Sequence, residues 1–197
     1  EGGPYIPGED AENAVSNAVF VFFHNGDFIQ ANNASSIDFS EVNDNEDYTI
    51  EKISKAVVIL NKPVRLPNQV VAILNSPLTK ADLNANAPSL NTLKNLICDC
   101  RNSGSGEFVM SNSVWSENFA AEITLNNLVE KTSDFENEGG NADTPNGGNE
   151  DVFNLTKEEE EKLKAVEVVN IHVERVLAKV NVTIAAIQDK IKTDGIY

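Results

Sequence analysis

One short stretch decides the fold class of this chain: AVFVFFHNGD, residues 18–27. Its first six residues are all apolar, so a strand formed by Ala18–Phe23 would be covered on both faces and would not turn one face toward water. The Asn25-Gly26 pair supplies the positive φ angles that a two-residue hairpin turn requires. We therefore predict a buried strand that turns back directly into a second strand beginning at Phe28.

Short runs of β-prone residues predict further strands along the chain. Pro63 and Pro67 interrupt one such region, and they place a connection there because proline lacks the N–H that a strand ladder needs. Trp115 lies between two of the runs, and its size predicts an anchor in the core or at its rim. The runs are Ala56–Leu60, Val70–Leu74, Phe108–Met110 and Ala121–Leu125.

Two short helices are expected in the connections. Thr79 can cap a turn that ends near Leu83, and Ser89 can cap a longer helix, because the hydroxyl of an N-cap residue accepts a bond from the first turn. In the second helix, apolar side chains recur at three-to-four spacing, which places them on one face. They are Leu90, Leu93, Leu96 and Ile97.

The last β-prone element changes the phase of its apolar side chains. Ile171 and Val173 alternate with polar residues in one phase, whereas the apolar positions from Val176 onward follow the other phase. Since side chains in a strand alternate with a period of two, the change at Glu174-Arg175 requires either a β-bulge or a strand that leaves one sheet and joins another. A strand shared between two layers of a β-sandwich has this pattern.

The chain divides into one domain with polar flanks. Residues 1–13 hold three glycines and two prolines, and they predict an extended arm. Residues 14–187 form the expected β domain. Within the domain, the acidic Gly/Asn-rich residues 132–151 predict a mobile loop. Lys157–Lys162, with four glutamates, predicts a solvated short helix or strand edge.

The chain is strongly acidic. Its 197 residues carry 15 Lys and Arg against 31 Asp and Glu, and 15 − 31 gives a net charge of −16. Such a chain would be repelled by nucleic-acid phosphates and by an anionic membrane surface, so neither is expected as a partner. The longest apolar runs are far shorter than the roughly 20 residues of a membrane-spanning helix. The composition is that of a soluble, acidic, extracellular-style surface.

The sequence contains no recognisable catalytic or cofactor motif. A hydrolase site would require both histidines, His24 and His172, to converge with a carboxylate. Cys98 and Cys100 lack the number and spacing of zinc ligands, and a disulfide between them would close only a small strained ring. Dinucleotide, P-loop and nucleophile-elbow motifs do not occur. We therefore expect no catalytic residue, no metal site and no cofactor, and we keep a surface hydrolase as the alternative from a different class.

Four stretches carry a resemblance to a known family: NAVSNAVFVFF (13–23), QVVAILN (69–75), FVMS (108–111) and, above all, IHVERVLAKV (171–180). Together they resemble the amino-terminal domain of the fimbrillins, the type V pilins of Gram-negative gut and oral anaerobes. The likeness is nearer to the major subunit of the short fimbria than to that of the long fimbria. The distinctive residues are Val173, Glu174, Arg175, Val176, Leu177, Ala178, Lys179 and Val180.

The resemblance implies a fold and a function. The implied fold is an all-β, two-layer β-sandwich of transthyretin-like Greek-key type, with one or two short helices in its connections. Fimbrillins are exported through the periplasm as lipoprotein precursors, cut after an arginine by a protease, and polymerised by strand addition. The implied protein is a non-enzymatic shaft subunit of an adhesive, extracellular fimbria attached at the outer membrane. Glu1 is then the mature amino terminus, and the resemblance implies that residues 188–197 are a linker toward a further, carboxy-terminal domain.

The resemblance also implies partners and a polymerisation groove. The partners are neighbouring fimbrial subunits, anchor and tip subunits, the arginine-specific protease, and a host protein or glycan. We expect the first strand to border the groove with an exposed apolar edge. An alternative function is a tip or accessory adhesin that binds a host protein or glycan through the polar segments Asn32–Asp47 and Ser133–Asp151. The expected groove residues are Val15, Val19, Val21 and Phe23.

Overall fold

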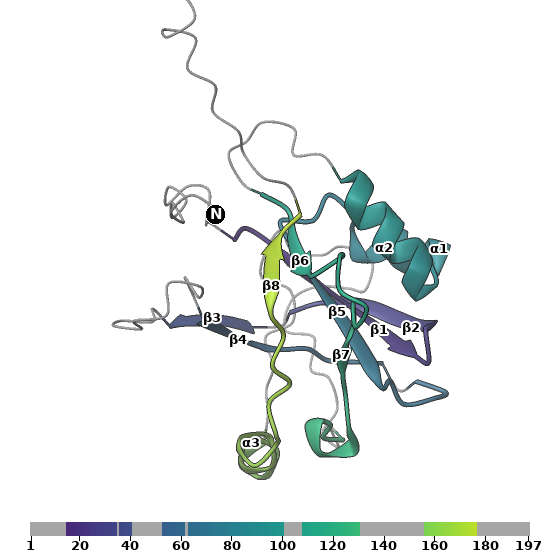
Figure 1. Cartoon of the computed structure of the whole chain (residues 1–197). Coiled ribbons are helices and arrows are strands. Elements are labelled where there is room, and N and C mark those ends of the chain that lie inside the picture. The colour runs from purple at the N-terminus through teal and green to yellow at the C-terminus, as the bar shows by residue number, and fades with distance from the viewer. Residues whose placement is uncertain are drawn as a thin grey trace, which may run out of the picture.

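The computed structural model describes residues 15–34, 36–40, 53–61, 63–100, 108–130 and 156–176, and Figure 1 shows their arrangement. At its centre is an antiparallel sheet with the strand order β2-β1-β5-β6-β8, and β7 pairs with β5 beyond the end of β6. A separate antiparallel pair is formed by β3 and β4. The strands are β1 (Ala18–His24), β2 (Asp27–Asn33), β3 (Ser36–Ser40), β4 (Ile53–Val57), β5 (Gln69–Leu74), β6 (Met110–Asn112), β7 (Ala121–Glu122) and β8 (Val173–Arg175).

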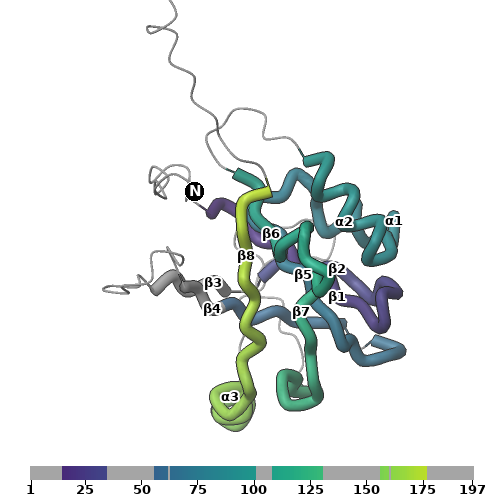
Figure 2. Tube along the Cα trace, in the orientation of Figure 1, coloured from purple at the N-terminus to yellow at the C-terminus, as the bar shows by residue number. Residues whose placement is uncertain are grey.

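A few short helices accompany the strands. Two of them, α1 and α2, lie together on one side of the main sheet, whereas α3 lies at the opposite end of the molecule, below β8 (Figure 2). The described residues thus form a mainly antiparallel β-sheet with a few short helices, as the sequence predicts. The helices are α1 (Lys80–Asn86), α2 (Leu90–Asp99), α3 (Lys157–Lys164) and the 3₁₀ turn η2 (Leu125–Asn127).

The predicted β1–β2 hairpin is confirmed. Asn25 and Gly26 have φ angles of 52° and 83°, so both turn residues adopt the positive φ of a two-residue hairpin loop. β1 then pairs with β2 along one edge and with β5 along the other. Its side chains are buried on both faces of the sheet, with Val21 on one face and Phe22 on the other. The burial of β1 on both faces of the sheet, which its apolar run predicts, is therefore also confirmed.

One face of the sheet is covered by α1 and α2, and we call its core the helix-side core. Both helices begin at the predicted caps. The Thr79 hydroxyl accepts a bond from the Asp82 amide at 3.1 Å, and the Ser89 hydroxyl accepts one from the Thr92 amide at 3.3 Å. The largest fully buried hydrophobic side chains of this core are Phe23, Ile73, Leu93, Ile97, Val21 and Val71.

The other face is covered by irregular segments, and we call its core the loop-side core. Among the described residues, three side chains of this core are buried: Phe22, Val70 and Ile123. Partly buried side chains pack around them from the chain after β4, from the chain after β7 and from the extended chain before β8. They are Phe20, Ile29, Val58, Leu60, Ala121, Leu128, Val169 and Ile171.

Several element boundaries differ from those expected. β4 ends at Val57, so the expected strand Ala56–Leu60 is mostly irregular chain, although part of it packs in the loop-side core. β7 has two residues, because the chain from Leu125 forms η2. The segment Asn32–Asp47 is not wholly a loop, since β2 runs to Asn33 and β3 follows it. These short strands are defined by their pairing partners, which local composition does not specify.

The expected role of Trp115 as a core or rim anchor is wrong. Its side chain is 78% exposed and lies in the turn between β6 and β7. The helix-side core buries both Val114, which directly precedes Trp115, and Phe119, which follows Trp115 by four residues. Because these two apolar side chains hold the turn against the core, the residue between them is directed into solvent.

The β-bulge expected at Glu174-Arg175 is absent, and within the described residues, which end at Val176, the strand does not change sheets. Ile171 packs in the loop-side core, whereas Val176 is buried in the helix-side core. Between them, β8 pairs with β6 in continuous register, with Ser111 opposite Glu174. Positions five apart in a regular strand face opposite ways, so Ile171 and Val176 reach the two cores while the chain stays at one edge of the sheet.

The glutamate-rich segment Lys157–Lys162 forms part of α3, which confirms the predicted short helix. One of its glutamates is not solvated. Glu159 is 2% exposed, and its carboxylate accepts a bond from the Thr156 amide at 2.9 Å while its own amide donates to the Thr156 hydroxyl at 3.3 Å. This reciprocal pair is a capping box, so the residue is used to begin the helix.

Other expectations fall on residues outside the described ranges. They include the amino-terminal residue Glu1, the arm at residues 1–13, the loop at residues 132–151 and the linker at residues 188–197. The second half of the family signature also lies outside, at Leu177, Ala178, Lys179 and Val180. These expectations stay predictions.

Candidate functional site

The first strand does not have the exposed apolar edge expected of a polymerisation groove. Val19, Val21 and Phe23 are buried in the helix-side core, and Val15 lies partly buried just before β1. Both edges of β1 are occupied, by β2 and by β5. The expected edge is therefore wrong, because the apolar run marks a strand in the middle of the sheet and not one at its margin.

The outer edge of β2 is closed by a side chain from α1. Asn84 Oδ1 accepts a bond from the Ala31 amide at 3.0 Å, and Asn84 Nδ2 donates to the Ala31 carbonyl oxygen at 2.8 Å. A single amide side chain thus takes the place of a neighbouring strand on this edge. At Ala31, β2 has neither a free donor nor a free acceptor to offer to another strand.

A second amide side chain fills a gap inside the sheet. β6 pairs with β5 at Leu74, and β7 pairs with the opposite end of the same edge at Val70. Between these two pairings, the buried Asn112 accepts a bond from the Ala72 amide at 2.9 Å and donates to the Val70 carbonyl at 3.4 Å. Asn112 therefore continues the hydrogen bonding of β5 where the chain turns away between β6 and β7.

The opposite margin of the sheet is open. β8 is an edge strand of three residues, and the extended chain Val168–His172 leads directly into it. In the described part of the chain, the backbone of these five residues makes no backbone hydrogen bond. Extended chain with unpaired N–H and C=O groups is a template for another strand. The side chain of Val168 is 68% exposed at this margin.

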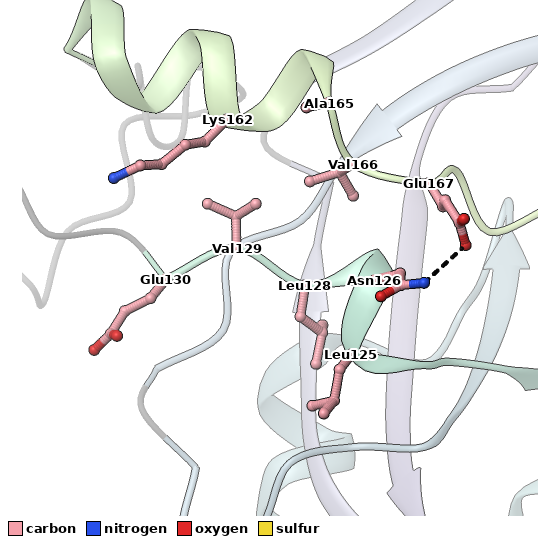
Figure 3. A pocket seen from close by; sticks show the side chains of 9 residues that line it. All are labelled: Leu125, Asn126, Leu128, Val129, Glu130, Lys162, Ala165, Val166 and Glu167. Carbon is pink, nitrogen blue, oxygen red and sulfur yellow. Dashed lines mark hydrogen bonds between the residues drawn. The ribbon is translucent and has the colours of Figure 1, made fainter.

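A groove of about 530 Å³ lies beside this margin, between α3 and the chain that follows β7 (Figure 3). Val166 follows α3 on one side, and Val129 points toward α3 from the other side. The two sides are joined at one end, where the Glu167 amide donates to the Asn126 carbonyl at 3.1 Å. The groove is lined by Leu125, Asn126, Leu128, Val129, Glu130, Lys162, Ala165, Val166 and Glu167.

The groove combines exposed apolar side chains with charged ones. Leu125 is 73% exposed, and Val129 is also exposed. Lys162 stands at the rim and pairs with Glu158 at 2.8 Å. The hydrogen bond with Glu158 raises the pKa of Lys162, so it is cationic at neutral pH. Two carboxylates, Glu130 and Glu167, supply the negative charge of the groove.

The visible half of the family signature lies at the open margin. Val173, Glu174 and Arg175 make up β8, and the guanidinium of Arg175 lies 5.1 Å from the centre of the Phe108 ring. Val176 follows and is buried, with its amide donating to the Val109 carbonyl at 3.0 Å. These residues therefore attach the edge strand to the sheet.

The two histidines do not form one constellation. His24 ends β1, with its Nδ1 2.9 Å from the Leu66 carbonyl oxygen, whereas His172 precedes β8. Two strands lie between β1 and β8, which corresponds to a separation of about 14 Å at the usual spacing of strands. Such a separation exceeds the reach of shared hydrogen bonds and argues against a hydrolase site that uses both histidines.

The two cysteines end α2. Cys100 is buried, and its thiol donates to the Leu96 carbonyl at 3.2 Å. Burial raises the pKa of Cys100, and the nearby Asp99 and Cys98 raise it further. Both thiols are free, and within the described ranges no group of three His, Cys, Asp or Glu is placed to hold a metal ion.

Comparisons with protein-family models, with curated proteins and with solved structures find no match to this chain. Among the residues that the structure describes, no helix has the length and apolar character to span a membrane. The resemblance to fimbrillins therefore stays a prediction drawn from the residues themselves.

The groove beside α3 is not predicted by the sequence. Leu125 is expected at the end of the strand Ala121–Leu125 but begins η2 instead, and Val129 is an isolated apolar residue in a polar segment. Trp115 was singled out but assigned to the core. The sequence does contain one indication of such a surface. Apolar residues that fit neither a strand period nor a helix period have no predicted partner in the core, so they are candidates for exposed positions.

Proposed function

We propose that this chain is the amino-terminal domain of a structural subunit of a cell-surface fimbria, and that it joins neighbouring subunits by β-strand addition. The proposed fold is the two-layer, transthyretin-like Greek-key sandwich implied by the family resemblance. In this fold, the β3–β4 pair belongs to the second layer, on the loop side of the main sheet. A separate β3–β4 pairing supports this assignment.

One observation carries the proposal: the backbone of Val168–His172, which continues β8 along the margin of the sheet, is unpaired among the described residues. Strand addition draws its affinity from main-chain hydrogen bonds to such an edge. The alternating Val169 and Ile171 already pack in the loop-side core, which fixes the extended conformation of the segment. An incoming strand therefore meets an edge that is formed before it binds.

The closed edge of β2 gives the proposed assembly a direction. Asn84 occupies the β2 edge at Ala31, and β1 is paired on both sides. Strand addition is thereby favoured at the β8 margin. An assembly that adds strands at one margin grows head to tail, as a fibre requires.

The remaining features of the proposal follow from the family. The subunit is exported as a lipoprotein precursor, matured by an arginine-specific protease and polymerised with copies of itself, together with anchor and tip subunits. It acts outside the cell, at the outer membrane, in adhesion to a host protein or glycan. It performs no catalysis and uses no cofactor.

The test is electron microscopy of the full-length precursor before and after treatment with an arginine-specific protease. Fibres that form only after cleavage are expected. Monomers in both samples would contradict a shaft subunit and would favour a tip or accessory adhesin.

A substitution in the open margin tests the acceptor edge itself. Val173→Pro removes one backbone N–H from the outer side of β8. The Val176 amide faces β6, so by the alternation of the ladder the Val173 amide faces away from β6, and proline is tolerated in an edge strand. Its matched control, Val173→Ala, keeps the N–H. We expect the proline variant to remain folded and to form fibres at least several-fold more slowly than the alanine variant. Equal rates for the two variants would place strand addition elsewhere.

A further inference from the structure

Trp115 is an exposed aromatic side chain on a well-anchored turn. The turn is closed by a bond from the Ser116 amide to the Ser113 carbonyl at 3.1 Å and by one from the Asn118 amide to the Ser116 hydroxyl at 3.1 Å. Val114, adjacent to the tryptophan, is buried in the helix-side core. The turn therefore presents the indole ring without the conformational freedom of a flexible loop, which lowers the entropic cost of using it as a contact.

The turn also has a cation beside the tryptophan. Lys94 of α2 donates to the Ser116 carbonyl at 3.2 Å, and its ammonium lies 5.8 Å from the centre of the Phe119 ring. The chain as a whole has 31 acidic residues against 15 basic ones, so Lys94 places a positive charge beside this tryptophan on an otherwise acidic protein. We call Trp115 and Lys94 the tryptophan knob.

The groove beside α3 has the matching chemistry. Its volume of about 530 Å³ exceeds that of one indole side chain, and Leu125, Val129 and Val166 supply apolar contacts (Figure 3). Glu130, Glu167 and Lys162 line the same groove, and Lys162 is already paired with Glu158 at 2.8 Å, so the two remaining carboxylates complement the ammonium group of the knob. In the sequence, the residues of the tryptophan knob come before β7, and those that line the groove come after it. Because the turn between β6 and β7 is anchored to the helix-side core, the knob cannot enter the groove of its own molecule.

We propose that the tryptophan knob of one copy of this chain inserts into the α3 groove of a second copy. The contact joins two different surfaces of the same protein, so it is heterologous and leaves a free knob at one end and a free groove at the other. Repetition of the contact produces an open chain of subunits. This contact does not depend on strand addition, and it would act beside it.

The contact is expected to be weak by itself. One aromatic anchor buries far less than the total of about 1,600 Å² that a stable protein interface buries. Self-association of the 197-residue chain should therefore be measured by sedimentation velocity at concentrations up to about 1 mM. Trp115 is the only tryptophan, so its fluorescence reports the contact directly. Its emission should shift to shorter wavelength as association proceeds.

Two variants and their mixture test the proposal. Trp115→Ala removes the knob, and Val129→Asp places a charge in the groove at an exposed position. Each variant alone should be monomeric at concentrations where the wild type associates. A mixture of the two should form one-to-one dimers and nothing larger, because each variant retains the half that the other has lost. Val64→Asp is the matched control, since it adds the same charge to an exposed valine outside both the groove and the open margin, and it should associate like wild type.

Other outcomes would overturn the proposal. These are a wild-type chain that stays monomeric with unchanged emission, a Trp115→Ala variant that still associates, and a mixture that forms no dimer. Loss of association in Val129→Asp alone would mean that the groove takes another occupant, such as an extended strand. Failure of this contact would leave the fibres formed by the cleaved precursor unaffected, so the two proposals fail separately.

Discussion

The two faces of the sheet are built in different ways. The helix-side core is sealed by α1 and α2, and most of its members are buried side chains from β1, β5 and the helices. Within the described ranges, the loop-side core has three buried members, and short irregular segments complete it with partly buried side chains. The exposed apolar residues Leu125, Val129 and Val168 all lie in segments that cover the loop side or adjoin them.

The loop side provides the open margin and the α3 groove, whereas the tryptophan knob projects from a turn that is anchored to the helix-side core. Two regular helices bury apolar side chains efficiently, because each presents a continuous apolar face to the sheet. Irregular segments bury less and leave backbone groups and apolar side chains at the surface, where another molecule can pair with them. The open margin and the α3 groove both lie on this second side.

The largest effect is expected from truncation in the helix-side core. Leu93→Ala should lower the free energy of unfolding by about 3 kcal/mol, because a fully buried leucine in a sealed core leaves a cavity. Leu96→Ala on the same helix removes an exposed side chain, and it should cost less than about 1 kcal/mol. Urea denaturation measures both. Similar losses for the two variants would show that α2 is not packed as described.

A smaller effect is expected in the loop-side core. Ile123→Ala should cost about 2 kcal/mol, at the lower end of the usual range, because the surrounding loops can close part of the cavity. Val168→Ala, at the exposed margin, should change stability by no more than about 0.5 kcal/mol. A loss at Ile123 that equals or exceeds the loss at Leu93 would break the contrast between the two faces.

The smallest effect concerns the cysteines at the end of α2. The raised pKa of Cys100 keeps its thiol protonated at neutral pH, so iodoacetamide should modify Cys98 first, as peptide mass spectrometry would show. Since the pKa of the folded state lies above that of the unfolded chain, the folded state holds this proton more tightly. The stabilisation that this proton gives the folded state is therefore complete below the ordinary thiol pKa of about 8.5, and it is lost as the pH rises further. Cys100→Ser should reduce this alkaline loss, and an unchanged pH profile would contradict the assignment.

Local patterns predicted those elements that local chemistry determines. Asn25-Gly26 determines a hairpin turn by itself, and Thr79 and Ser89 cap their helices through bonds within one turn. The period of the apolar residues in α2 likewise identified Leu93 and Ile97 as buried, whereas Leu96, predicted on the same face, is exposed. In each case the interactions that decide the structure lie within a few residues of one another.

Properties that depend on distant partners were not predicted. The apolar run of β1 cannot reveal that β5 takes its second edge, so an exposed edge was expected where none exists. The composition around Trp115 does not show which side of the turn faces the core. The amide bonds of Asn84 and Asn112 to other strands are also non-local, and an asparagine-rich sequence gives no sign of which amides will form them.

The position of β8 in the chain also determines when this strand pairs during folding. The pair His24–Asp27 closes the first hairpin over a separation of 27 − 24 = 3 residues, whereas the pair Ser111–Glu174 closes over 174 − 111 = 63 residues. The entropy lost in closing a loop grows with its length, so the hairpin forms early and β8 docks late. During synthesis or passage through a membrane pore, the edge of β6 stays unpaired until residue 174 has emerged. The margin proposed to receive a neighbouring strand is therefore the last part of the sheet to be completed.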